Sequence, residues 1–208
     1  MRNLAILGAG GHGRVVAETA VLLGWRTILF FDDAWPKRSV SGTWEIVGNT
    51  QTLIDCANEV DGVVVAIGDN YVRMELIAEF LRLGLNVPAL VHPRAFVSSD
   101  SQIGSGTVVL AGAVVQTGSS IEAGCIINTS ASIDHDCHIG SAVHVCPGAH
   151  LAGNVTAGSR CTIGVGASVS HGISIGHCVV IGAGAVVIND LVEGITVVGN
   201  PARIISAK

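Results

Sequence analysis

The chain has 208 residues, which is enough for two compact domains or one large one. Hydrophobic residues make up 49% of it, aromatic residues only 4%, and glycine occurs 27 times. This composition excludes a disordered chain and favours a core of aliphatic and small side chains with many tight turns. The net charge of −5 and the lack of any Lys/Arg run exclude a typical nucleic-acid-binding surface.

The first apolar run, Leu4–Leu7, is too short for a membrane span or for the core of a signal peptide. We therefore expect a protein that is not inserted in a membrane and works in the cytoplasm. None of the six cysteines forms a Cys-x-x-Cys pair, which argues against a zinc ribbon or a thioredoxin-type motif. A cytoplasmic location predicts reduced thiols.

The N-terminal part of the chain predicts a small α/β domain with a Rossmann-like parallel sheet. The expected strands are 4–7, 27–31, 46–47, 62–67 and 89–91, and the expected helices are 12–23, 50–57 and 70–83. The apolar run at 62–67 is typical of a strand buried on both faces of a parallel sheet. Strands that alternate with helices indicate a βαβαβ unit, and we expect residues 1–92 to form this domain.

A glycine-rich loop lies between the first strand and the first helix. Gly8, Gly10 and Gly13 have the spacing of the dinucleotide fingerprint, in which glycines let the backbone approach a pyrophosphate. An acidic residue about 20 positions later holds a ribose hydroxyl, and Asp32 or Asp33 occupies that position. Because so short a domain fits only one mononucleotide-binding half, a nucleotide-sugar is favoured over NAD. A purely structural turn is a third reading.

Two further groups lie near this expected pocket. The ring of His12, inside the glycine loop, would donate toward the ligand, unless His12 is simply an exposed loop histidine. Gly68 follows the buried strand, at the edge where ligands gather in open α/β sheets. Asp69 or Asn70 is equally suited to cap the next helix, and both roles are compatible.

A six-residue repeat runs without insertion or deletion from residue 97 to residue 187. Stepping by six from Val97 gives sixteen positions, and all are Val, Ile or Leu except Ala157. Four residues after each comes a second series of mostly small side chains, which includes Cys125, Cys137 and Cys161. Each unit is thus a short strand and a turn, and three successive units close one coil. Coils stack about 4.8 Å apart, so residues 93–208 are predicted to form an all-β stack of parallel strands.

The segment 127–139 contains the largest group of side chains that could act in catalysis. His135 is flanked by Asp134 and Asp136, and a carboxylate bonded to imidazole fixes its tautomer and raises its basicity. Stacked coils of three units form a triangular prism. At the third position of its hexapeptide, the side chain of His135 should point outward near a corner of this prism. There it could take a proton from an amine or hydroxyl. A solvated surface histidine is the alternative. His144 is half a coil further on, so the two histidines can meet only if another copy packs alongside.

A metal site would be another use for the plentiful histidines. His135 and His171 share one column, but two coils of about 4.8 Å separate them by roughly 9.6 Å. Zinc needs ligands at about 2.0–2.1 Å, which this spacing does not allow. We therefore expect no metal.

The repeat resembles that of the hexapeptide-repeat acyltransferases, and this resemblance implies a left-handed coil. Further motifs are similar to those of the nucleotide-diphospho-amino-sugar N-acetyltransferases of the bacillosamine pathway, with the sialic-acid O-acetyltransferases as broader relatives. These motifs are Gly8-Ala9-Gly10-Gly11-His12-Gly13, Phe31-Asp32-Asp33, Ala66-Ile67-Gly68-Asp69-Asn70, Asn128-Thr129-Ser130, Ile133-Asp134-His135-Asp136-Cys137 and Ala152-Gly153-Asn154-Val155.

The resemblance implies that His135 is the general base and that Asp136 enhances its basicity. It implies a nucleotide-sugar site, with Asn128 beside it, made by Gly10, Gly11, His12, Asp32, Asp33 and Gly68. Contacts to acetyl-CoA are implied for His144, Val165 and Ala183, in a homotrimer with active sites between subunits. The family has Glu where this chain has Asp136, and Gly where it has Ala183.

The sequence thus predicts an acetyl-CoA-dependent N-acetyltransferase that acts on a nucleotide-linked amino-sugar, expected to be a UDP-4-amino-4,6-dideoxy sugar. Transfer is expected to be direct, because no cysteine or serine has a base at the spacing of a covalent nucleophile. One alternative is a sugar O-acetyltransferase of the sialic-acid type. Another is a non-catalytic nucleotide-sugar-binding trimer.

Overall fold

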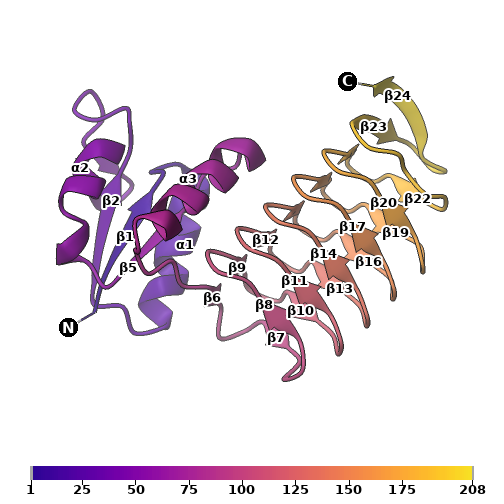
Figure 1. The fold of residues 1–208 in the computed structure, drawn as a ribbon, viewed down its shortest axis with the longest axis horizontal. Coiled ribbons are helices and arrows are strands. Elements are labelled where there is room, and N and C mark those ends of the chain that lie inside the picture. The colour runs from indigo at the N-terminus through magenta and orange to yellow at the C-terminus, as the bar shows by residue number, and fades with distance from the viewer. Residues whose placement is uncertain (1, 208) are drawn as a thin grey trace.

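A computed structural model describes residues 2–207 and divides the chain into an N-terminal α/β part and a C-terminal stack of coils. Figure 1 shows the coils rising side by side away from the α/β part, with the C-terminus at the far end of the stack. Both expected fold classes are confirmed. The junction of the two parts positions the candidate site.

The N-terminal sheet has five strands in the order β3-β4-β2-β1-β5. Their bounds are β1 Asn3–Leu7, β2 Thr27–Phe31, β3 Val40–Ser41, β4 Trp44–Gly48 and β5 Gly62–Val65. β1 pairs in parallel with β2 and with β5, and β4 pairs in parallel with β2. β3 pairs antiparallel with β4, so one edge is formed by a hairpin that was not predicted from the sequence.

Within residues 2–207, three α-helices and one short 3-10 helix accompany the sheet: α1 Gly11–Leu22, α2 Thr50–Asp55, η1 Ala57–Glu59 and α3 Asn70–Arg82. Asp69 caps α3, because its carboxylate accepts the N–H groups of Tyr71 and Val72. This confirms one of the two expected caps. α1 begins at the glycine loop with no side-chain cap. Its first N–H groups therefore have no side-chain acceptor.

The prediction that a strand at 89–91 belongs to the N-terminal sheet is wrong. β6, Leu90–Val91, pairs instead with the coil strand β9, and the N–H of His92 donates to Val109 O at 2.8 Å. The chain has already left the α/β sheet at this point, because β6 occupies the place of a coil strand one full coil before β9.

The coil strands are two residues long and recur at every sixth position. They are β7 Phe96–Val97, β8 Gln102–Ile103, β9 Val108–Val109, β10 Val114–Val115, β11 Ser120–Ile121, β12 Ile126–Ile127, β13 Ser132–Ile133, β14 His138–Ile139, β15 His144–Val145, β16 His150–Leu151, β17 Thr156–Ala157, β18 Thr162–Ile163, β19 Ser168–Val169, β20 Ser174–Ile175, β21 Val180–Ile181 and β22 Val186–Val187. Each ends on a position of the aliphatic series, so the sixteen-unit repeat is confirmed.

Strands one coil apart pair in parallel and form three faces of a left-handed prism. The β7 face contains β7, β10, β13, β16, β19 and β22, and the β8 face contains β8, β11, β14, β17 and β20. The β9 face contains β6, β9, β12, β15, β18 and β21, and it continues into β23 Ile195–Val198 and β24 Arg203–Ala207. β23 and β24 form an antiparallel hairpin.

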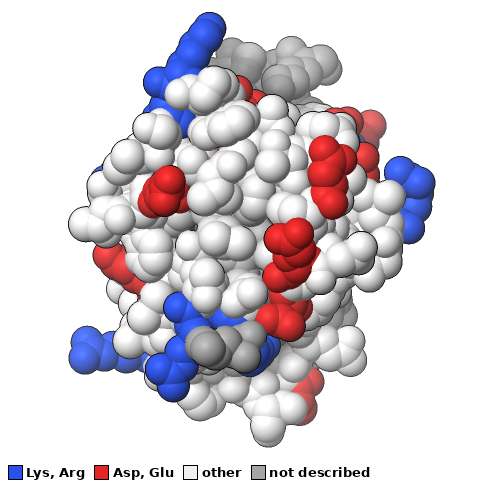
Figure 2. Space-filling view, turned by 90° about the vertical axis from the view of Figure 1, so that its left-hand side faces the viewer, with Lys and Arg blue, Asp and Glu red and all other residues white. Residues whose placement is uncertain are grey.

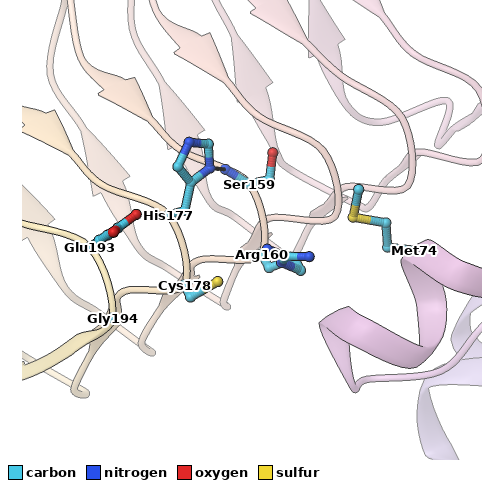
Figure 3. Close-up of a pocket in the computed structure, with 7 residues that line it drawn as sticks. All are labelled: Met74, Ser159, Arg160, His177, Cys178, Glu193 and Gly194. Atoms are coloured by element: carbon cyan, nitrogen blue, oxygen red, sulfur yellow. Dashed lines mark hydrogen bonds between the residues drawn. The ribbon is translucent and has the colours of Figure 1, made fainter. Parts of the chain in front are cut away.

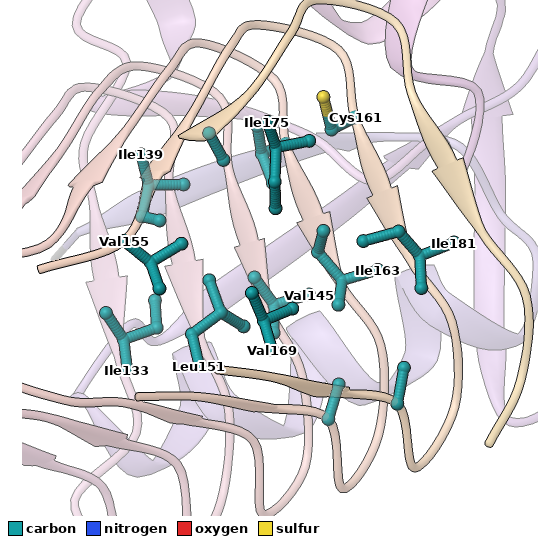
Figure 4. Packing of buried hydrophobic residues seen from close by; sticks show 14 of the residues in the cluster. Ile133, Ile139, Val145, Leu151, Val155, Cys161, Ile163, Val169, Ile175 and Ile181 are labelled. Atoms are coloured by element: carbon teal, nitrogen blue, oxygen red, sulfur yellow. The ribbon is translucent and has the colours of Figure 1, made fainter. Parts of the chain in front are cut away.

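The prism is filled by the two series that the repeat predicted. The aliphatic positions, from Val109 to Val187, are almost completely buried, and so are small ones such as Ala113 and Cys137. Figure 4 shows these side chains pointing inward between successive coils. Burying one Val or Ile side chain contributes about 1.5–3 kcal/mol, so the repeated layers account for the stability of the stack.

Helix α3 lies along one edge of the prism, the edge between the β8 and β9 faces (Figure 1). One helical turn rises about 5.4 Å and one coil about 4.8 Å, so successive turns meet successive coils. Ile77 packs on this edge at Gly106 and Gly124, where a Cβ would lie 2.9 Å from Ile77 Cδ1. Both glycines also have positive φ, which disfavours any L side chain.

None of the helices within residues 2–207 has the length and apolar character needed to span a bilayer. On the face shown in Figure 2, the charged side chains form small separate groups, and most of the surface is uncharged.

The contact between α3 and the prism predicts unequal effects of two glycine substitutions. Gly124→Ala and Gly166→Ala both place a Cβ at positive φ, which costs roughly 1–2 kcal/mol. Only the first also crowds the buried Ile77, since a Cβ at Gly166 meets nothing within 4 Å. We expect Gly124→Ala to lower the free energy of unfolding by about 1–3 kcal/mol more, measured by urea denaturation. Equal losses would contradict this packing.

Candidate active site

The histidine with the strongest catalytic geometry is His135, in the turn that joins β13 to β14. Its Nδ1 lies 2.8 Å from Asp136 Oδ2, and its backbone N–H donates to Asp134 Oδ1 at 2.8 Å. If Nδ1 carries the proton and donates it to Asp136, Nε2 is left with a lone pair. The pair therefore has the arrangement of a general base and its orienting carboxylate, as the sequence indicated.

The hydrogen bond that His135 donates to Asp136 raises the pKa of His135, and the negative charges of Asp134 and Asp136 add to this effect. The ring is about half exposed, with 48% of the side chain accessible. Asp136 adopts φ +58, a conformation that Asp tolerates better than most residues. This turn thus holds the carboxylate beside the ring.

Gly153, one coil above, leaves room for the imidazole of His135. A Cβ at this position would overlap the ring, first of all at Nε2. The backbone beside it is regular, since the N–H of Asn154 donates to His135 O at 2.8 Å. The absence of a side chain at Gly153 therefore lets the ring lie along the edge of the prism while Asp136 holds its other nitrogen.

His171 lies closer to His135 than the coil spacing suggested. The two ring centroids are 6.3 Å apart. The distance expected from two full coils was therefore too large for the side chains. The rings can lean toward each other because the coil between them has Gly153 in the same column. Within residues 2–207, no group of three or more His, Cys, Asp or Glu side chains has a metal-binding arrangement.

A second group of polar residues lies on the β9 face, next to the α/β domain. Nδ2 of Asn128 is 3.0 Å from Nε2 of His144, which makes the amide the donor and leaves the other imidazole nitrogen, Nδ1, protonated. Burial, with the charges of Arg73 and His12, lowers the pKa of His144 to about 4. His144 is therefore neutral at physiological pH.

His12 belongs to the same group, so the alternative of a simple exposed loop histidine is wrong. Burial first, and then the charge of Arg73, lowers the pKa of His12 to about 4. Its Nε2 is buried and has no hydrogen-bond partner within the described residues. An unpaired polar atom of this kind is costly, and a ligand in the loop would satisfy it.

The glycine loop and the two acidic residues are held together. Asp32 Oδ2 accepts the N–H of Ala9 at 2.8 Å, and Asp33 Oδ1 accepts the N–H of Thr50 at 2.9 Å. Gly10 and Gly11 are exposed, and a Cβ at either would meet nothing within 4 Å. The open space therefore lies directly over the start of α1, where a phosphate would meet unpaired N–H groups.

Val165 and Ala183 occupy the edge between the β9 and β7 faces. They are one coil apart, since the N–H of Gly184, the next residue, donates to Val165 O at 2.8 Å. Both are exposed, and Val165 keeps 54% of its surface accessible. The structure thus brings together two of the three residues expected to contact acetyl-CoA, on the edge that borders the face of His144.

His135 does not join these groups within one chain. It lies on the edge between the β7 and β8 faces, and in a three-sided prism that edge is opposite the β9 face. His144, Asn128 and His12 are all at the β9 face or packed against it. The separation expected from the half-coil spacing is therefore present in the structure.

A large cavity lies elsewhere, beside Met74 of α3, and Figure 3 shows the residues that line it. It measures about 430 Å³ and is lined by Met74, Ser159, Arg160, His177, Cys178, Glu193 and Gly194. A smaller cavity of about 210 Å³ connects Gly68 and Asn70 to the same edge. Neither contains His135, so cavity size alone does not locate the chemistry.

Arg73 was not predicted as a site residue, although it contacts both Gly68 and the prism. Asn70 was expected at the ligand edge of the sheet or as a cap, whereas its amide binds the β9 face. One feature of the sequence could have indicated their role. Asn70, Arg73 and Ile77 have helical spacing, so Arg73 lies on the side of α3 that is otherwise buried.

The chain is similar to several known proteins. The family model described as the PglD N-terminal domain matches residues 3–80. UDP-N-acetylbacillosamine N-acetyltransferase of Bacillus subtilis is 39% identical over 115 residues, which are 53% of this chain and 52% of that protein. The match thus spans about half the length of this curated relative.

Two solved structures match nearly the whole chain. The acetyltransferase domain of PglB from Neisseria gonorrhoeae, in complex with acetyl coenzyme A, has a TM-score of 0.94 and 43% identity, over 98% of this chain and 99% of that one. PerB from Caulobacter crescentus, in complex with CoA and GDP-perosamine, has a TM-score of 0.93 and 35% identity, over 99% and 98%. Structures of that enzyme with one histidine replaced by Asn or Ala are also similar.

A left-handed prism with a histidine–carboxylate pair on one edge, joined to a small α/β domain, defines a hexapeptide-repeat acyltransferase. With these matches, the chain belongs to the family of the bacillosamine- and perosamine-type N-acetyltransferases.

The raised pKa of His135 predicts a defined pH dependence. A general base must be neutral, so kcat/KM should fall as the pH drops below the His135 pKa, which lies above the usual 6.5. Asp136→Asn removes the largest cause of the shift, and the acid limb should move to lower pH. The plateau should fall by about an order of magnitude, because the base is weaker.

Asp134→Asn is the matched control for this pH profile. Asp134 acts on the ring through its charge and contributes less than the hydrogen bond that the ring donates to Asp136. The acid limb of Asp134→Asn should therefore move less than that of Asp136→Asn. Equal shifts in the two variants, or no shift in either, would exclude the proposed pairing.

Proposed function

We propose that the protein is an acetyl-CoA-dependent N-acetyltransferase of a nucleotide-linked amino-sugar. The His135–Asp136 pair, held at an exposed edge of the prism, is the observation that carries this proposal. The relatives support the substrates, because PglB is described with acetyl coenzyme A and PerB with CoA and GDP-perosamine. A UDP-4-amino-4,6-dideoxy sugar is the acceptor we propose, by analogy with the bacillosamine enzyme.

The reaction we propose is a direct transfer. The sugar amine attacks the thioester carbonyl of acetyl-CoA while Nε2 of His135 takes a proton from the amine. The tetrahedral intermediate collapses, the C–S bond breaks, and CoA leaves as a thiolate that accepts the proton from His135. Asp136 stabilises the imidazolium in between, and backbone N–H groups near the cleft would stabilise the oxyanion.

The acceptor would bind at the α/β domain. Gly10 and Gly11 leave room for the diphosphate at the start of α1, and His12 offers the buried Nε2 that lacks a partner among the described residues. Asp32 and Asp33 would hold the ribose with the oxygen capacity that their backbone bonds leave free. Gly68 is exposed at the edge of the same sheet, and Asn128 would approach the sugar from the prism, where it is bonded to His144.

The acetyl donor would lie along the edge of the prism that carries Val165 and Ala183. Their exposed positions, one coil apart, support an extended contact with CoA, and neutral His144 would contact the donor from the β9 face. Ala183 has one methyl group more than the Gly of the family, which a contact through the backbone tolerates.

We propose further that the active form is a homotrimer. Because His135 is on the edge opposite the acceptor face, a neighbouring copy must supply the base. His135 of one copy would then face His144 and Asn128 of the next. A cytoplasmic location belongs to the same proposal, since a reducing compartment suits a protein whose thiols, such as Cys125, serve as packing groups.

A thiol-release assay tests the proposal. The wild-type chain should release CoA from acetyl-CoA with UDP-, GDP- or dTDP-linked 4-amino sugars, and not with sialic acid or other hydroxyl sugars. His135→Ala should lower the rate by about 10²–10⁴-fold. His150→Ala, which changes an exposed histidine on the β7 face, is the control and should keep full activity.

Three outcomes of this assay would contradict the proposal. Release of CoA only with hydroxyl sugars would make the protein an O-acetyltransferase. No release with any acceptor would favour a binding protein without catalysis. Full activity of His135→Ala would show that the base is another residue.

A further inference from the structure

Arg73 is a buried cation that takes no part in the proposed reaction. It is the largest fully buried side chain among the described residues, with 1% of its surface exposed. Burial lowers its pKa to about 10, so it stays charged at physiological pH. No carboxylate within residues 2–207 forms an ion pair with it. A charge in this position is stable only if hydrogen bonds compensate the lost hydration.

Those hydrogen bonds come from both domains. Nη1 donates to Ile67 O at 2.8 Å and to Gly68 O at 3.2 Å, on the loop at the edge of the acceptor pocket. Nε donates to Gly124 O at 2.7 Å, and Nη2 donates to Ala142 O at 2.9 Å, both on the prism. A single planar group therefore joins the loop to two coils.

Asn70 extends this link to a third coil. Its Oδ1 accepts from Arg73 Nη2 at 2.6 Å. Its Nδ2 lies 3.2 Å from Arg160 O, 3.1 Å from Cys161 O and 3.0 Å from Thr162 Oγ1. With this bond to Asn70, all five N–H donors of the guanidinium are engaged, so none is left for a phosphate group.

The three coil positions follow the repeat. Gly124, Ala142 and Arg160 occupy equivalent places in successive coils and lie above one another on the edge between the β8 and β9 faces. A contact with only one coil would hold the loop at one point and leave it free to tilt. Contacts with three successive coils fix both its height along the prism and its tilt.

We propose that Arg73 is a positioning residue for the acceptor: with Asn70, it sets the height of the Ile67–Gly68 loop on the prism and so aligns the sugar with the β9 face. This inference rests on the proposed function, because it takes Gly68 as the edge of the nucleotide-sugar pocket. Arg73 positions the acceptor through the loop and does not touch it. Its guanidinium fork is essential, since lysine has the charge but cannot make five directed bonds in a plane.

Steady-state kinetics of Arg73→Lys, with a nucleotide-linked 4-amino sugar and acetyl-CoA, test the proposal. A displacement of about 1 Å at a positioned substrate costs on the order of 10²-fold, so kcat/KM for the acceptor should fall by that factor. The KM for acetyl-CoA should stay within about twofold of wild type, because its proposed site is on another edge. Arg82→Lys, exposed in the last turn of α3, is the matched control and should leave both constants unchanged.

An unchanged kcat/KM for the acceptor would overturn the positioning role. So would a KM for acetyl-CoA that rises by the same factor as kcat/KM for the acceptor falls. Asn70→Ala provides a second variant if Arg73→Lys does not fold. It keeps the bonds from Arg73 to the loop and removes the link to the third coil. It should therefore lower kcat/KM for the acceptor by a smaller factor, again with the KM for acetyl-CoA unchanged, and an unchanged acceptor constant would count against the proposal.

Hydrogen–deuterium exchange separates this inference from the proposed function. The amides of residues 67–69 should exchange faster in Arg73→Lys than in the wild type, while those of β15 should not change. If the wild-type chain acetylates no nucleotide-linked sugar, the proposed function fails, and the exchange data still decide whether Arg73 holds the loop. Unchanged exchange at residues 67–69 would overturn the inference in either case.

Discussion

The uninterrupted coil of three hexapeptides is the constraint on which the rest of the structure depends. Because no residue is inserted between positions 97 and 187, every outward side chain keeps a fixed direction, and residues one coil apart form straight columns. The columns place His135 on one edge and His144 on the opposite face. They also give α3 an edge whose period nearly equals its own pitch. One repeat thus determines how the domains meet, and it underlies the proposal that two copies build one site.

The electrostatics divide in the same way. On the exposed edge, Asp136 raises the pKa of His135 and prepares a base. At the junction of the domains, burial and the charge of Arg73 lower the pKa of His12 and His144, which keeps these two rings neutral. In the proposed reaction, the neutral rings at the junction would serve nucleotide binding, and the exposed edge would serve proton transfer. The two proposed functions would thus use different surfaces of one fold.

Features with a local or periodic signature could be predicted from the sequence. The coils follow from the repeat, and the His135–Asp136 pair follows from its adjacency in the chain. Leu90–Val91 could not be assigned correctly, because two apolar residues do not identify their partner strand. Arg73 escaped detection because its partners are mostly backbone oxygens, which leave no trace in the side-chain pattern. The burial of His12 depends on packing between distant segments, which local sequence does not encode.

A mixed oligomer tests most directly the central claim that two copies build one site. Gly10→Asp places a carboxylate where the diphosphate would bind, at a position with room for a side chain, and His135→Ala removes the base. Each variant alone should be inactive. Co-expressed in equal amounts, they should recover about a quarter of the wild-type rate, because that fraction of sites pairs an intact pocket with an intact neighbouring histidine. Recovery of no activity, with mixed oligomers demonstrably formed, would contradict the account.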